Sequence, residues 1–328
     1  MPRQARLDAP GTLHHIMGRG IEGTKIFRNK VDRTDFLQRL AEPCQDGGLI
    51  LYAWALMSNH FHILARTANQ ALSRSMRRLL TGYVINFNRR HKRQGHLFQN
   101  RYKSIVCEDD PYLLELTRYI HLNPLRAGVV KNFNVVRTYP WTGHSTIMGR
   151  LKREWQDTQT VLAYFGPSQK EAVTYYEKFV QEGIALGRRP ELVGGGLVRS
   201  VGDWFQVLSL RRKGIRVASD YRILGSSEFV QGLLSEVDER EKETLRLSSK
   251  IKSLDSLAGS IEKNEVTTGL RSASRTRKVS KARRIFCQLA VGKMGYPGAE
   301  VARFLGVTTS AVVRASKTEE LEEVQKYL

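Results

Sequence analysis

The chain has 328 residues, of which 53 are lysine or arginine and 32 are aspartate or glutamate, so its formal net charge is +21. A protein this basic binds polyanions, and nucleic acid is the default partner. The sequence has no run of 18 apolar residues and no signal-peptide pattern, so we expect a cytoplasmic protein that does not enter a membrane. Cys44, Cys107 and Cys287 are far apart and odd in number, which argues against a disulfide framework and a cysteine zinc site.

The length and the hydrophobic fraction of 41% predict two or three domains with cores of their own. The first 70 residues predict a strand, a helix and then two strands. Apolar patterns predict the strands over 12–19, 49–57 and 60–66. The helix lies between the first and second of these strands, and Asn29 or Asp32 can begin it. Both side chains can accept hydrogen bonds from the free backbone N–H groups of a first helical turn.

The most informative stretch places two histidines one residue apart in a predicted strand. Because side chains alternate along a strand, His60 and His62 point the same way, about 7 Å apart, while Phe61 points to the other face. Neutral imidazoles bind divalent metals, so the pair predicts half of a metal site that needs further ligands. His14 and His15 face opposite ways, so that one of them can approach this site. The alternative to a metal site is that the two histidines occur at this spacing by chance on a half-exposed strand.

Positive charge surrounds these histidines, since no aspartate or glutamate occurs between Gly47 and Cys107. Residues 71–91 carry apolar side chains at three- and four-residue spacing, which predicts an amphipathic helix with an arginine-rich opposite side. With no acids interspersed, this side favours contact with DNA phosphates, and a solvated surface is the alternative. The predicted phosphate-binding residues are Arg74, Arg77, Arg78, Arg89 and Arg90 of this helix, with Arg101 and Lys103 of the basic turn that follows.

A second chemical element lies on the helix that residues 108–110 begin and that Pro124 is expected to end after Asn123. Tyr119 and Asn123 stand four residues apart, so they share a helix face about 6 Å from each other. A tyrosine in such a place is often a core residue, and that alternative stays open. A phenol has a pKa of about 10 and is therefore a poor nucleophile at neutral pH. It needs a nearby cation to attack a phosphate. A metal held by the histidine pair would supply that cation.

Five separated segments, in order, resemble the REP-associated tyrosine transposases, which belong to the single-tyrosine transposases with a His-hydrophobic-His motif. The motifs are specific because they are several and keep their order. They are Met-Pro-Arg at 1–3, Gly-Thr-Leu-His-His-Ile-Met-Gly-Arg-Gly at 11–20, Ala-Leu-Met-Ser-Asn-His-Phe-His-Ile-Leu at 55–64, Gly-His-Leu-Phe-Gln-Asn-Arg-Tyr-Lys-Ser at 95–104, and Tyr-Ile-His-Leu-Asn-Pro-Leu-Arg-Ala-Gly-Val-Val at 119–130.

This resemblance covers residues 1–145 and implies an α+β fold, a ferredoxin-like antiparallel sheet with helices. It implies that His60 and His62 bind Mg²⁺ or Mn²⁺ and that Tyr119 is the nucleophile. Asn123 matches the position of a further polar ligand. It also implies a transposase that cuts and rejoins single-stranded DNA at hairpins or repeats through a 5′-phosphotyrosine intermediate. Such a protein would work in the bacterial cytoplasm at the nucleoid, as a monomer or a homodimer.

The rest of the chain predicts three further parts. Residues 146–251 form a helical middle region, and residues 252–278, rich in serine, threonine and lysine, form a linker. Residues 279–328 predict three helices that resemble the DNA-binding domain of the replication initiator DnaA, with a helix-turn-helix whose third helix enters the major groove. A generic three-helix bundle is the alternative. The residues predicted to contact duplex DNA are Thr308, Thr309, Ser310 and Arg314.

Two functions of different class fit the sequence. The first is a transposase, and it is favoured because His60, His62 and Tyr119 are all present. The second is a sequence-specific DNA-binding regulator that keeps the fold and no longer cuts. A covalent adduct with labelled hairpin DNA would separate them, because only the first function forms a bond between protein and DNA.

Overall fold

The computed structural model describes Leu7, residues 10–193 apart from 69 and 188, residues 220–235, and residues 253–327 apart from 266, 268, 273, 275 and 295. The chain divides into two compact units, Met1–Gly232 and Leu233–Leu328. Of the helical middle region predicted over 146–251, residues 194–219 and 236–251 lie outside the described residues. No helix in the described part of the chain is both long and apolar enough to span a membrane.

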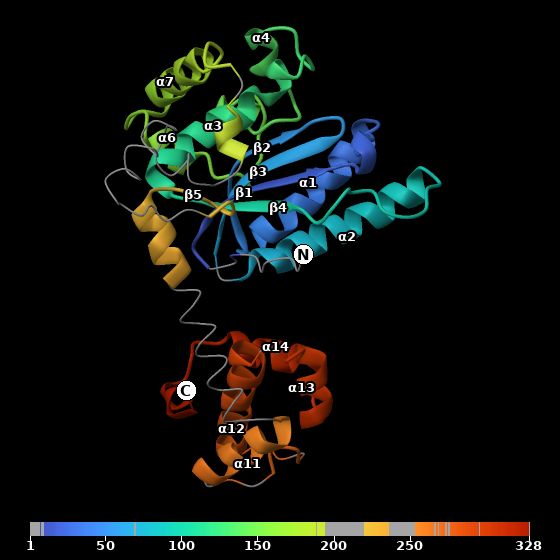
Figure 1. Cartoon of the computed structure of the whole chain (residues 1–328), viewed down its shortest axis with the longest axis vertical. Helices are drawn as coiled ribbons and strands as arrows, with labels where there is room; N and C mark the ends of the chain where they lie inside the picture. The colour runs from blue at the N-terminus through green and yellow to red at the C-terminus, as the bar shows by residue number, and fades with distance from the viewer. Residues whose placement is uncertain are drawn as a thin grey trace, which may run out of the picture. The chain divides into compact units, whose positions relative to one another are not determined.

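The first unit is built on a five-stranded sheet with the order β2-β3-β1-β4-β5 (Figure 1). The first four strands are antiparallel neighbours and follow the strand-helix-strand-strand-helix-strand order of a ferredoxin-like fold, which confirms the predicted α+β class. The sequence did not predict β5, which pairs in parallel with β4. These elements are β1 (Leu13–Arg19), α1 (Lys30–Gln45), β2 (Leu49–Leu56), β3 (His60–Thr67), α2 (Leu72–Arg90), β4 (Lys103–Cys107) and β5 (Ile223–Leu224).

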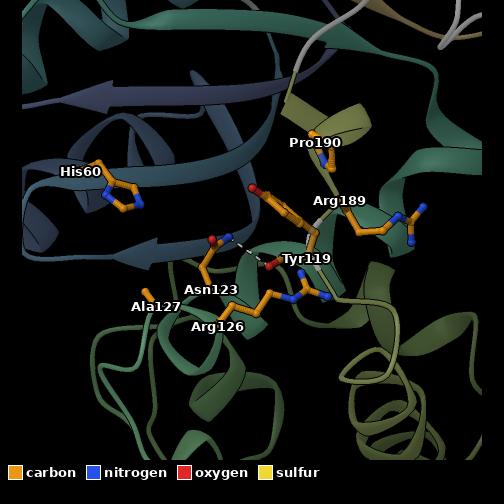
Figure 2. A pocket seen from close by; sticks show the side chains of 7 residues that line it. All are labelled: His60, Tyr119, Asn123, Arg126, Ala127, Arg189 and Pro190. Atoms are coloured by element: carbon orange, nitrogen blue, oxygen red, sulfur yellow. Dashed lines mark hydrogen bonds between the residues drawn. The ribbon is translucent and has the colours of Figure 1, made fainter.

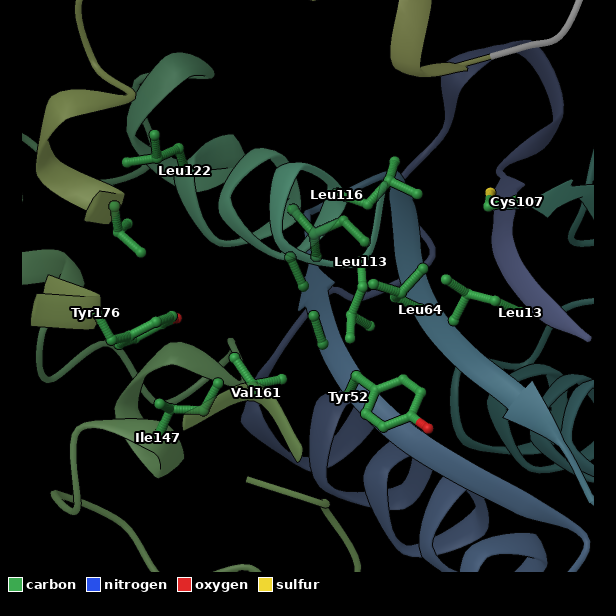
Figure 3. Packing of buried hydrophobic residues seen from close by; sticks show 14 of the residues in the cluster. Leu13, Tyr52, Leu64, Cys107, Leu113, Leu116, Leu122, Ile147, Val161 and Tyr176 are labelled. Atoms are coloured by element: carbon green, nitrogen blue, oxygen red, sulfur yellow. The ribbon is translucent and has the colours of Figure 1, made fainter. Parts of the chain in front are cut away.

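Helices cover both faces of the sheet. On one face, α1 and α2 enclose a core that includes Phe61 and Ile63. On the other face, a second core includes Leu64 and residues of α3, α6 and α7 (Figures 1 and 3). The remaining elements of the unit are η1 (Ile21–Gly23), α3 (Asp109–Arg126), α4 (Phe133–Val136), α5 (His144–Ile147), α6 (Gln159–Ala163), α7 (Gln169–Glu182) and η2 (Pro190–Val193).

Both predicted cap residues begin α1. Asn29 accepts a hydrogen bond from the backbone N–H of Asp32, and the Asp32 carboxylate accepts one from the backbone of Asn29, which makes a capping box. The same carboxylate is fully buried and pairs with Arg90 at 2.5 Å and with His91 at 2.9 Å. One acidic residue thus starts α1 and ties it to the end of α2.

Helix α3 continues through Pro124 to Arg126, so the expected stop at Asn123 is wrong. A proline within a helix lacks the N–H that would bond to the carbonyl four residues earlier, but near the end of a helix that loss affects a turn that is already ending. The carbonyl of Pro124 accepts bonds from the N–H groups of Val129 and Val130, which close the chain around Gly128. Gly128 adopts φ +67°, the left-handed conformation common after a helix end.

The second unit contains the three helices predicted near the end of the chain, and it also begins earlier than predicted. Residues 254–264, expected to be linker, form α11, so that expectation is wrong there. Leu257 and Ile261 of α11 are buried against α12, which gives this polar segment an apolar face. The elements are α11 (Leu254–Asn264), α12 (Arg277–Cys287), the π-helical turn η3 (Gln288–Lys293), α13 (Gly298–Leu305), α14 (Thr309–Lys317) and η4 (Glu322–Tyr327).

Two fully buried histidines share one tyrosine in the first unit. The Tyr176 hydroxyl lies 2.7 Å from His121 Nδ1 and 3.1 Å from His144 Nδ1. Burial lowers the pKa of His144 to about 3 and that of His121 well below its usual value. At about pH 6.5, histidines of the unfolded chain take up protons. Both imidazoles are still neutral in the folded protein at that pH.

We therefore expect the first unit to lose stability as the pH falls below about 6.5, the pKa of an unfolded histidine. The unfolded chain binds protons that the folded chain does not bind. This lowers the free energy of unfolding by up to about 1.4 kcal/mol per pH unit for each histidine. Urea unfolding followed by tryptophan fluorescence measures this, since Trp54, Trp141 and Trp155 belong to the first unit and residues 233–328 contain no tryptophan. The double variant His121→Asn, His144→Asn should show a shallower pH dependence, and an unchanged slope would contradict the assignment.

Candidate functional site

The register of the sheet gathers three histidines on the α3 face. Met17 pairs with His62, and Arg19 pairs with His60. Residues that pair directly point to the same face, and so does every second residue along a strand. His15 therefore joins His60 and His62, and its Nε2 lies 3.0 Å from His62 Nδ1. Of the two neighbouring histidines, His15 is the one that approaches the predicted site.

Helix α3 places Tyr119 over these imidazoles. The ring centroid of Tyr119 lies 5.8 Å from that of His62 and 6.1 Å from that of His15. The phenol points into a cavity of about 350 Å³, toward the side where His60 lies (Figure 2). The cavity is lined by His60, Tyr119, Asn123, Arg126, Ala127, Arg189 and Pro190.

Hydrogen bonds leave one nitrogen of His60 free for a ligand. The side-chain amide of Asn59 donates to the carbonyl of Gly23 at 3.2 Å, which turns its oxygen toward His60 Nδ1 at 2.7 Å. An amide oxygen only accepts, so His60 donates from Nδ1 and keeps a lone pair on Nε2. In His62, Nδ1 is engaged with His15, so Nε2 is the nitrogen left for a ligand.

All three imidazoles are held neutral. Burial lowers the pKa of His15 to about 4 and the pKa of His60 to about 4, and the charge of Arg19 adds to the effect at His60. Burial also holds the pKa of His62 well below its usual value, with smaller contributions from its two histidine neighbours. The neutral form is the one that binds metals.

The residues present fit a divalent metal that also binds a phosphate. Two imidazole nitrogens are free, and Asn123 lines the cavity that His60 also lines, while its amide donates to the Tyr119 carbonyl at 3.0 Å. Among the described residues, no group of three or more His, Cys, Asp or Glu side chains is placed to hold a metal ion. Water and phosphate oxygens would have to complete the coordination of Mg²⁺ or Mn²⁺, as is common for these ions.

The phenol itself is not activated by the protein alone. Burial raises the pKa of Tyr119, and the nearby Asn123 amide and Arg126 guanidinium oppose this only in part. The guanidinium lies 5.5 Å from the centre of the Tyr119 ring. Its Nη2 donates to the carbonyl of Gly183, but its Nε and Nη1 are buried with no partner within the part of the chain that the structure describes. Buried donors without partners are rare, and a phosphate oxygen is a strong acceptor for them.

A second cavity of about 290 Å³ is lined by both His60 and His62. Arg101 and Lys103, both predicted to bind phosphate, line it together with Arg19. Positively charged side chains therefore line both cavities beside the imidazoles. The full lining is Met17, Gly18, Arg19, His60, Phe61, His62, Gln99, Asn100, Arg101 and Lys103.

The arginine-rich side of α2 lies away from this site, because α2 covers the opposite face of the sheet. Two of its arginines also have acidic partners on or just beyond α1. Arg78 pairs with Glu42 at 3.1 Å and with Asp46 at 2.7 Å, and Arg90 pairs with Asp32 and Asp35. For α2, the expectation of positive charge beside the histidine pair is therefore wrong. For Arg74, Arg77 and Arg89, which are exposed, contact with DNA stays a prediction.

Sequence reasoning did not single out Arg19, Arg126 or Arg189 as site residues. The first two lie inside the segments 11–20 and 119–130 that carry the family resemblance, so a signal was there. Arg189 follows Tyr119 by 70 positions and sits in no recognisable motif. The residues predicted to bind duplex DNA, Thr308 to Ser310 and Arg314, belong to the second unit.

The first unit is an α+β fold. On one face of its sheet, two imidazoles that can bind a metal face a tyrosine on a helix. Residues 11–123 match the family described as "Transposase IS200 like", which supports the predicted resemblance to the transposases. A solved structure described as "Structure of the REP associates tyrosine transposase bound to a REP hairpin" matches with a TM-score of 0.36 and 15% identity, over 48% of this chain and 96% of that chain. No curated protein matches the chain.

We expect Arg126→Met to weaken binding of a single-stranded oligonucleotide roughly tenfold, because a hydrogen bond to a charged group contributes about 1.5–3 kcal/mol. Fluorescence anisotropy with a labelled oligonucleotide measures it. Arg150→Met is the matched control, since it removes one positive charge at a position that does not line either cavity beside His60. Equal losses in the two variants would show that only net charge matters.

Proposed function

We propose that the first unit cuts and rejoins single-stranded DNA, at hairpins or repeats, with Tyr119 as the nucleophile. The observation that supports this best is the convergence of His60, His62 and Tyr119 on one face of the sheet, with ring centroids 5.8 Å apart between Tyr119 and His62. Arg126 lines the cavity beside Tyr119, and two of its buried donors have no partner among the described residues, which supports a phosphate as the ligand. The family match over residues 11–123 agrees with a transposase.

In the proposed reaction, the phenol oxygen of Tyr119 attacks the phosphorus of the scissile phosphate. The bond from phosphorus to the 3′ oxygen breaks, and the 5′ side stays joined to Tyr119 as a phosphotyrosine. The phenolic proton is lost to solvent, and the leaving 3′ oxygen takes up a proton. Attack by a 3′ hydroxyl on the phosphotyrosine reverses these steps and rejoins a strand, so the energy of the phosphodiester is kept.

The chain's own residues supply placement and charge for this reaction. His60 and His62 would hold Mg²⁺ or Mn²⁺ through Nε2, with Asn123 nearby, and the bound ion would supply Lewis-acid polarisation of the phosphate. Arg126 would donate to a phosphate oxygen beside Tyr119. Arg19, Arg101 and Lys103 would bind the DNA that continues past the histidine pair, since they line the second cavity.

We expect Tyr119→Phe to abolish the covalent adduct with labelled hairpin DNA in Mn²⁺ while DNA affinity stays within about twofold, because only the attacking oxygen is lost. Denaturing gel electrophoresis detects the adduct. Tyr102→Phe is the matched control, since Tyr102 packs into the core on the α1 and α2 face. An adduct that survives in Tyr119→Phe would mean another nucleophile, and no adduct with the unaltered protein would favour the non-cutting regulator.

We also propose that the second unit binds duplex DNA through α14. Gly306 adopts φ +66° in the turn between α13 and α14, and Thr308 caps α14 by accepting from the N–H of Ala311. Ala302, Leu305 and Val312 are buried, as the helix-turn-helix prediction requires, while Thr309 and Arg314 are exposed. Exposed polar side chains at the start of such a helix are well placed to reach base edges.

The double variant Thr309→Ala, Arg314→Ala should lose selectivity for a duplex sequence selected from a random pool with the unaltered protein. The expected loss is about 1–3 kcal/mol per base-reading contact, and a smaller loss that is uniform across sequences would mean phosphate contact only. Gel-shift titration at two salt concentrations measures both. Arg277→Ala, which removes an exposed arginine from α12, is the control, and unchanged duplex binding by the double variant would leave α14 without this role.

A further inference from the structure

We propose that His15 is a positioning residue for the metal site, and that the segment Arg189–Val193 holds it in place. Together they keep the proton of His62 on Nδ1, so that Nε2 faces the site as a free acceptor. This inference rests on the proposed function, because it concerns the ligand His62. It adds a part of the chain that lies outside residues 11–123, which match the transposase family.

The argument begins at the carbonyl of Leu192. His15 Nδ1 lies 3.1 Å from this oxygen in a fully buried contact. A carbonyl can only accept a hydrogen bond, so His15 must carry its proton on Nδ1. A neutral imidazole that carries its proton on Nδ1 has a lone pair and no proton on Nε2.

This lone pair determines which ring nitrogen of His62 carries the proton. His15 Nε2 lies 3.0 Å from His62 Nδ1, and the two rings stack with centroids 5.2 Å apart. Since His15 Nε2 can only accept, His62 must donate from Nδ1. Its Nε2 is then unprotonated, which is the form that a metal requires. With the proton on Nε2 instead, two lone pairs would face each other between the rings, and the nitrogen facing the site could not bind a cation.

The segment Arg189–Val193 is held against the sheet at three points. Lys103 Nζ donates to the carbonyl of Val193 at 2.7 Å, next to the His15 bond to Leu192. The Leu192 side chain is only 2% exposed and belongs to the core on the α3 face. Arg189 pairs with Glu115 of α3 at 3.2 Å. The position of this segment therefore controls which proton arrangement the buried histidines adopt.

Nitrogen NMR of the full chain labelled with ¹⁵N-histidine tests this without any substitution. The imidazole nitrogen shifts distinguish the Nδ1–H from the Nε2–H form, and triple-resonance correlations in uniformly ¹³C,¹⁵N-labelled protein assign the signals to the two residues. We expect both His15 and His62 to be in the Nδ1–H form at pH 7. A His62 that carries its proton on Nε2 would overturn the proposal even if every variant failed to fold.

Metal affinity provides the second measurement, by Mn²⁺ titration followed by electron paramagnetic resonance in the absence of DNA. We expect His15→Phe, which cannot accept from His62, to weaken Mn²⁺ binding about tenfold or more and to leave His62 without a fixed form. His15→Gln should restore most of the affinity, since its amide oxygen can accept from His62 Nδ1. His14→Gln is the control, because His14 bonds to Thr12 and Ser104.

The outcomes separate this inference from the proposed function. If His60→Ala and His62→Ala abolish Mn²⁺ binding while His15→Phe leaves both the affinity and the His62 shifts unchanged, the positioning role fails and the metal site stands. If His60→Ala and His62→Ala bind Mn²⁺ as the unaltered protein does, the metal site itself fails. Lys103→Met tests the segment separately, since releasing Val193 should shift His15 away from a single form.

Discussion

The pairing of β1 with β3 is the constraint on which the site depends. Side chains alternate along a strand, so a slip of one residue would turn His15 and Arg19 to the α1 and α2 face and leave His60 and His62 alone. The opposite face holds this register. A Cβ atom at Gly18 would lie 2.5 Å from the ring of Phe61, so only glycine lets β1 lie over that buried ring. The apolar core on one face thus sets the chemistry on the other.

The distribution of positive charge shows why local composition misled the sequence analysis about α2. No acidic residue occurs between Gly47 and Cys107, and this absence suggested arginines without partners. The partners lie earlier in the chain, on α1 and directly after it, and the packing of α1 on α2 brings Asp32 and Asp35 to Arg90. Charge pairs across two packed helices are set by tertiary structure, so counting acids within one window cannot find them.

Helices and strands with a regular apolar pattern were predictable from the sequence. Contacts made by segments far away in the chain were not. The strands β1 to β3, the helices α1 and α2, and the shared face of His60 and His62 follow from alternation and helical spacing. The segment Arg189–Val193 could not be found in this way, because its contribution is a backbone carbonyl on His15 and no side-chain pattern encodes that. Helix α11 was hidden by its polar composition, since only its buried stripe shows that it packs.

The electrostatics of the first unit explain why the proposed chemistry would wait for DNA. Burial keeps His15, His60 and His62 neutral and raises the pKa of Tyr119, and the charge of Arg126 opposes that rise only in part. Arg126 is the cation beside Tyr119, and two of its buried donors lack partners in the described part of the chain. A phosphate would satisfy those donors and bring the oxygens that a metal on two imidazoles still needs. The same ligand would thus complete both halves of the site, which would tie activation of the proposed nucleophile to the presence of the DNA.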